Sequence, residues 1–287
     1  MITRVVHRRV EVDGVEVFYR QSLPDVPDAP ALLLLHGFPS ASHQFRRLID
    51  AIGSRFRLIA PDYPGFGHTR VPDGFAYSFD HLADTVEGFV DRLALDRFTM
   101  YLFDFGAPVG FRLALRQPER IAGLVVQNGN AYAEGLSDAA RDFVSLTPDT
   151  PGAEQAILDL LTLEATRAQY EGGTTDPELI APEGWLLDQY FLDQPGRRQA
   201  QLALAYDYHR NITAYPDWQK WLRDHQPPTL ITWGVNDPFF TEAGARAYLR
   251  DVPGAALHLL DTGHFALEDD LPRIAPLVTD FLAGIEG

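Results

Sequence analysis

The alternation of apolar runs and helical patterns is the feature that most constrains the fold of this chain. In the first 129 residues, short continuous apolar runs alternate with segments whose apolar residues recur at helical spacing. Continuous apolar runs are typical of strands that are covered on both faces of a sheet. Strands that alternate with helices indicate βαβ units, and these predict a largely parallel sheet with helices on its faces.

The individual elements of this first part can be placed along the chain. The opening segment alternates apolar and polar residues on both sides of Asp13-Gly14, which predicts a β-hairpin. Further strands are predicted at residues 31–35, 56–60, 98–103 and 121–126, and helices at 42–52, 79–95 and 109–115.

The alternation stops after Gly129 and resumes at Thr229. The intervening part has helical patterns and turns but no convincing strand, so we expect a core domain of residues 1–129 and 223–287. Residues 130–222 would then form a helical cap, inserted as a lid between two strands. Helices are predicted in the cap at 153–168, 185–192 and 197–208; after it, strands are predicted at 229–233 and 256–260 and helices at 241–249 and 274–282.

Composition excludes several classes of function. The chain has no cysteine, which excludes disulfides, Cys-ligated zinc and a thiol nucleophile. A net charge of −16 disfavours binding to nucleic acid or to an anionic membrane surface. Without a signal-like or membrane-spanning apolar run, we expect a cytoplasmic protein. We expect no metal and no cofactor, because neither a metal-ligand cluster nor a glycine-rich nucleotide loop is present; a homodimer is left open.

Four segments follow predicted strands and carry glycine or polar residues. The first is His36-Gly37-Phe38-Pro39, and the others contain Asp104, Asp237 and His264. In open α/β sheets ligands bind at the carboxyl ends of the strands, so we expect these segments to meet. Asp104 stands between a strand and a helix, where it either caps the helix or takes the place of Ser in a nucleophile elbow. The histidines at positions 43, 68 and 81 are expected at the surface or in turns.

With these segments the chain resembles α/β-hydrolase-fold enzymes of the epoxide hydrolase and haloalkane dehalogenase branch. The resemblance covers nearly the whole chain and rests on the hairpin, HGFP, the Asp elbow, the cap, GVNDP and TGHF. It implies an eight-stranded, mostly parallel sheet flanked by helices, with the cap inserted after the sixth strand. It also implies that Asp104 is the nucleophile. The chain departs from the branch at Leu102, Phe103 and Phe105, where many members have a small residue, His and Trp.

An Asp nucleophile leads to a two-step hydrolysis. A carboxylate is ionised at neutral pH and can attack an sp³ carbon without a base, which leaves an ester on Asp104. His264, oriented by Asp237, would then activate water to hydrolyse that ester. The backbone N–H groups of Phe38 and Phe105 would bind the oxyanion of the tetrahedral intermediate.

The leaving group distinguishes the alternatives within this branch. Haloalkane dehalogenases that resemble this chain bind halide with a Trp after the nucleophile and often an Asn after the HG pair; fluoroacetate-type dehalogenases have an Arg after the nucleophile. This chain has Phe105 and Phe38 at those positions, and neither side chain can donate a hydrogen bond. Epoxide hydrolases typically protonate the epoxide oxygen with cap phenols. Two cap stretches resemble the regions that carry those phenols, and they contain Tyr190, Tyr208 and His209.

The sequence therefore favours an epoxide hydrolase-like enzyme that acts on a small, neutral, apolar substrate. A dehalogenase with an atypical halide site is the alternative among enzymes. A non-catalytic ligand receptor on the same fold is the alternative of another class, and the presence of all three triad residues argues against it.

Overall fold

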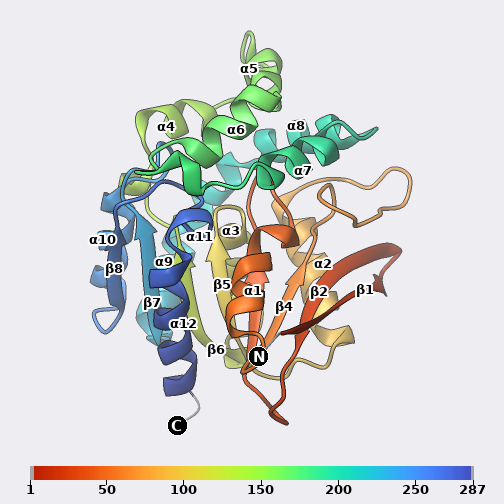
Figure 1. Ribbon diagram of the computed structural model, residues 1–287. Coiled ribbons are helices and arrows are strands. Elements are labelled where there is room, and N and C mark those ends of the chain that lie inside the picture. The colour runs from red at the N-terminus through yellow and green to blue at the C-terminus, as the bar shows by residue number, and fades with distance from the viewer. Residues whose placement is uncertain (1–2, 286–287) are drawn as a thin grey trace.

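A single eight-stranded sheet forms the centre of the computed structural model, which describes residues 3–285 (Figure 1). The strand order is β1-β2-β4-β3-β5-β6-β7-β8. The first two neighbouring pairs are antiparallel and all the others are parallel, which confirms the expected architecture. The strands are β1 (Arg4–Val12), β2 (Val15–Leu23), β3 (Ala31–Leu35), β4 (Arg57–Pro61), β5 (Phe98–Phe103), β6 (Ile121–Gln127), β7 (Thr229–Gly234) and β8 (Ala256–Leu260).

The predicted hairpin is present as β1 and β2. Val12 pairs with Val15, so the turn consists of Asp13 and Gly14 alone. Both residues have positive φ, the backbone conformation that lets a two-residue turn follow the twist of its strands.

Helices cover both faces of the sheet, and each face has its own hydrophobic cluster. Strand β5 shows the division, because Met100 and Leu102 belong to one cluster and Tyr101 and Phe103 to the other. The first cluster packs against α2 (Phe79–Arg92), α3 (Gly106–Arg116), α9 (His209–His225) and α10 (Glu242–Asp251); the second packs against α1 (Arg46–Ile52) and α12 (Leu271–Ile285).

Five helices between β6 and β7 form a layer above the carboxyl ends of the parallel strands (Figure 1). We refer to α4–α8 as the helical layer. Short helical turns accompany it and the core: η1 (Ser42–Phe45), η2 (Pro118–Arg120), η3 (Ala133–Gly135), η4 (Pro177–Leu179) and α11 (Ala266–Asp269). The layer itself consists of α4 (Asp138–Val144), α5 (Ala153–Asp159), α6 (Leu163–Glu171), α7 (Glu183–Leu192) and α8 (Arg197–Asp207).

The structure differs from the sequence prediction at two places in this region. The single helix expected at 153–168 is two helices, because the Thr162 hydroxyl accepts the N–H of Ala165 and caps a new helix, α6. Helix α9 follows α8 directly but packs against the core, where Trp218 stacks on Phe111 of α3. The division of the chain at residues 130–222 therefore stays a prediction, with α4–α8 as the part that lies over the sheet. No helix within residues 3–285 is both long and apolar enough to cross a membrane.

Candidate active site

Asp104 lies on the sharp turn between β5 and α3. Its φ is 47°, a left-handed conformation that Asp tolerates better than most residues. Two glycines allow the chain to pass close to this turn. A Cβ on Gly37 would lie 2.3 Å from Cβ of Asp104, and a Cβ on Gly106 would lie 2.1 Å from the Leu35 carbonyl oxygen. The turn therefore has the geometry of a nucleophile elbow, with Asp104 in the central position.

Two backbone N–H groups bind the Asp104 carboxylate. Phe38 N–H donates to Oδ1 over 2.6 Å, and Phe105 N–H also donates to this carboxylate. These are the two groups that the sequence predicts for an oxyanion site. Burial raises the pKa of Asp104 above its ordinary value, while His264 and the two N–H groups act in the opposite direction.

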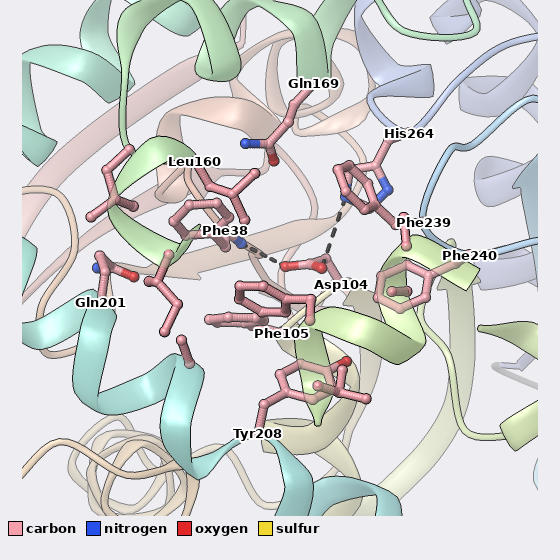
Figure 2. Close-up of a pocket in the computed structure, with 17 residues that line it drawn as sticks. Phe38, Asp104, Phe105, Leu160, Gln169, Gln201, Tyr208, Phe239, Phe240 and His264 are labelled. Atoms are coloured by element: carbon pink, nitrogen blue, oxygen red, sulfur yellow. Dashed lines mark hydrogen bonds and ion pairs between the residues drawn. The ribbon is translucent and has the colours of Figure 1, made fainter. Parts of the chain in front are cut away.

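His264 lies between the two acidic residues. Its Nδ1 is 2.6 Å from Asp237 Oδ2, and its Nε2 is 3.9 Å from Asp104 Oδ2 (Figure 2). Burial alone lowers the pKa of His264, but the charge and hydrogen bond of Asp237, together with Asp104, raise it above 6.5. The structure thus brings Asp104, Asp237 and His264 together from the ends of three strands, as the sequence predicts.

Asp237 is fixed by donors on all sides. Its Oδ1 accepts the N–H groups of Phe239 and Phe240, at 2.7 and 3.1 Å. Its Oδ2, which contacts His264, also accepts a hydrogen bond from Asn128 Nδ2 over 2.7 Å. Asn128 also accepts the N–H of Gly234 through Oδ1, so it links the ends of β6 and β7. Sequence reasoning missed Asn128, although a polar residue just after a buried strand is the signal that located the triad.

A cavity of about 170 Å³ lies beside Asp104 and His264, under the helical layer. Its lining is mostly apolar and comes from the core loops and from α4, α5 and α8. Three side chains other than the triad residues bring polar groups to it (Figure 2): Gln169 of α6, Gln201 of α8 and Tyr208 at the α8–α9 junction. Sequence reasoning identified Tyr208 but neither glutamine, since no motif marks them.

The predicted substrate residues are not all at the cavity. Tyr208 lines it, and its hydroxyl is hydrogen-bonded to that of Tyr215. Tyr190 does not line it and is 59% exposed, because Asp188 and Phe191 occupy the buried side of α7. His209 is also exposed, and its Nδ1 is bonded to the Tyr206 carbonyl. The expectation that Tyr190 and His209 face the substrate is therefore corrected.

The buried histidine His43 is a further difference from the sequence prediction. It is 3% exposed, and its Nε2 is 2.8 Å from Asp188 Oδ1 in α7. His68 and His81 are exposed, as expected. Among residues 3–285, no group of three or more His, Asp or Glu side chains has the arrangement of a metal site.

Comparison with known proteins agrees with this geometry. The family model described as alpha/beta hydrolase fold matches residues 30–271. Uncharacterized hydrolase YNR064C of Saccharomyces cerevisiae is 41% identical over 96% of this chain and 97% of its own length. Haloalkane dehalogenase 2 of Mycobacterium bovis is 30% identical over 89% of each chain. Epoxide hydrolase 2 of Caenorhabditis elegans is 24% identical over 93% of this chain and 77% of its own.

Solved structures show the same fold. Haloalkane dehalogenase DbeA from Bradyrhizobium elkani superimposes with a TM-score of 0.84, at 24% identity, over 99% of both chains. The family match spans most of the chain, and the named relatives at 30% identity or above are hydrolases. The chain therefore belongs to the α/β-hydrolase fold family, and it is a hydrolase related to haloalkane dehalogenases and epoxide hydrolases.

Proposed function

We propose that the protein is an epoxide hydrolase-like enzyme with Asp104 as its nucleophile. The observation that carries this proposal is an aspartate at the elbow, 3.9 Å from a histidine that is itself bonded to Asp237. That separation is longer than a hydrogen bond, so His264 does not tie up the attacking oxygen. A carboxylate in this position can attack carbon directly, whereas serine would need the histidine as a base.

The reaction proceeds in two balanced steps. In the first, an Asp104 oxygen forms a bond to an epoxide carbon as the ring C–O bond breaks, and the ring oxygen takes a proton. In the second, His264 removes a proton from water, which attacks the ester carbonyl of Asp104. The N–H groups of Phe38 and Phe105, which act on the Asp104 carboxylate, would stabilise the oxyanion formed there. Collapse of this intermediate breaks the ester C–O bond, and the departing oxygen takes the proton from His264 to complete the diol. The proton that remains on the Asp104 carboxyl returns through solvent to the group that protonated the ring oxygen, which restores the carboxylate.

Tyr208 is the group best suited to protonate the ring oxygen. Burial, reinforced by the neighbouring Tyr215 and Asp104, holds the pKa of Tyr208 well above its ordinary value, so the phenol stays neutral. The neutral phenol keeps the proton that it would donate to the ring oxygen as the C–O bond breaks. Among the described lining residues, Gln169 also carries a donor without a hydrogen-bond partner, but its amide N–H group can only bind the ring oxygen and does not give up its proton.

Dehalogenation remains the second candidate because haloalkane dehalogenase 2 is among the relatives. A halide leaves without a proton but needs hydrogen-bond donors, and the side chains of Phe38 and Phe105 offer none. The apolar cavity suits a small, neutral substrate in either case.

Two matched substrates test the choice. We expect the enzyme to convert 1,2-epoxyhexane to its diol and to release little bromide from 1-bromohexane. Bromide release faster than diol formation would replace the epoxide assignment with the dehalogenase one. A protein that turns over neither compound and carries no substrate mass after incubation would contradict both and favour a ligand receptor.

A further inference from the structure

Gln201 carries a buried, unsatisfied acceptor beside the cavity. This side chain lies on α8, is 3% exposed and lines the cavity. Its Nε2 donates to the Gly65 carbonyl over 3.1 Å, which fixes the orientation of the carboxamide. Its Oε1 is buried and has no hydrogen-bond partner among the residues that the structure describes. Figure 2 shows this oxygen on the side of the carboxamide that faces Phe38 and Phe105.

A buried acceptor without a partner is costly, and such atoms are uncommon in folded proteins. The bond to Gly65 accounts for the amide nitrogen, but nothing in the mostly apolar lining accounts for the amide oxygen. The carboxamide becomes favourable once a ligand donates a hydrogen bond to Oε1. A neutral donor fits better than an ammonium group, because an ammonium group would lose its hydration inside an apolar cavity.

We propose that Gln201 recognises a hydroxyl or amide N–H group on the substrate. This inference rests on the proposed function and narrows it: the substrate is a small epoxide that carries a hydrogen-bond donor away from its reactive carbon. The arrangement of the site indicates where on the substrate this donor group lies. Gln201 lies on the opposite side of Asp104 from His264 in Figure 2, with Phe38 and Phe105 between. The donor group is therefore at the end of the substrate remote from the ester-forming carbon.

A matched pair of epoxides tests this assignment. We expect wild-type enzyme to have a kcat/KM for 5,6-epoxyhexan-1-ol about ten-fold above that for 1,2-epoxyhexane, or for the corresponding pair at another chain length from about four to eight carbons. In Gln201→Leu the hydroxyl group should lose this advantage. The plain epoxide should change only a few-fold, because it never made the contact. Gln201→Leu also removes the hydrogen bond to Gly65, but it does so for both substrates. The ratio of the two kcat/KM values therefore reports only the contact between Oε1 and the substrate hydroxyl.

Gln199→Leu is the matched control, since Gln199 is exposed on the same helix. It should leave the ratio as in wild type. A ratio that is the same in wild type and Gln201→Leu at every chain length would overturn the inference while leaving the Asp104 mechanism intact.

A binding measurement separates this inference from the chemistry. Calorimetry with 1-hexanol and 1-methoxyhexane needs no turnover, and only the alcohol can donate to Oε1. We expect wild type to bind the alcohol about ten-fold more tightly than the ether, and Gln201→Leu to lose that difference. If neither epoxide is converted but this difference is present, the proposed function fails and Gln201 recognition stands. If epoxides are converted but the alcohol shows no preference, the reverse holds.

Discussion

At the scale of single residues, the roles proposed for His264 and Asp104 give the reaction a defined pH dependence. Water activation needs neutral His264, and Asp237 holds the pKa of that imidazole above 6.5. Attack needs ionised Asp104, whose pKa is raised by burial but starts from 3.8. Esterification removes the Asp104 charge, which lowers the pKa of His264 somewhat, while the larger contribution of Asp237 remains.

We therefore expect ester hydrolysis to slow as pH falls through the pKa of His264, while attack continues. Rapid-quench mass spectrometry of wild-type enzyme should find more ester at about pH 5.5 than at about pH 8. His264→Gln should carry the ester at both pH values. An ester fraction that rises with pH in wild type would contradict this assignment of roles.

Tyr208 and Tyr190 provide a matched test of which group protonates the ring oxygen. Tyr208→Phe should reduce epoxide opening by about 10²–10⁴-fold, the usual worth of general-acid assistance. Tyr190→Phe should leave the rate unchanged, because Tyr190 is 59% exposed and lies outside the cavity. Steady-state kinetics with 1,2-epoxyhexane measures both. If Tyr208→Phe is as active as wild type, the ring oxygen takes its proton from another group and the assignment of Tyr208 is wrong.

At the scale of elements, a buried polar cluster connects α6 and α7 of the helical layer to η1 of the core. Asp188 of α7 accepts the Tyr170 hydroxyl of α6 over 2.6 Å and lies 2.8 Å from His43 of η1. Asp188 is fully buried, so removing its carboxylate leaves both partners without their acceptor.

We expect Asp188→Leu to lower the free energy of unfolding by about 1–3 kcal/mol, the usual cost of leaving a buried polar group without its partner. Asp142→Leu, at an exposed position of α4, should change it by about 0.5 kcal/mol or less. Denaturant unfolding followed by circular dichroism measures both variants. Equal unfolding midpoints for Asp188→Leu and wild type would mean that the cluster does not stabilise the layer.

The strands and the helical layer differ in how well the sequence predicts the placement of their side chains. Strands such as 98–103 are continuous apolar runs, and the residues after them meet at one edge of the sheet, so the triad could be placed from the sequence. The helical layer offers no such rule. Its helices are short, and one missed cap at Thr162 divides a predicted helix in two. A side chain there faces the cavity or the solvent according to its phase on the helix, which is why Tyr190 was misplaced and Gln201 was missed.

At the scale of the whole molecule, the proposed function assigns the chemistry and the substrate selectivity to different layers. The sheet supplies Asp104, Asp237 and His264 from its strand ends. The helical layer supplies most of the cavity wall, including Gln169 and Gln201. Substitutions of these glutamines should therefore alter which substrates react without preventing ester formation on Asp104.

The formation of that ester is the central claim, and intact-protein mass spectrometry of His264→Gln tests it most directly. After mixing with 1,2-epoxyhexane, we predict that the protein gains the full mass of the epoxide, because attack needs no base whereas hydrolysis does. Peptide mapping should place the added mass on the segment that contains Asp104, and Asp104→Ala should gain none. An unmodified His264→Gln protein, under conditions in which wild type converts the same epoxide, would contradict the nucleophilic role of Asp104.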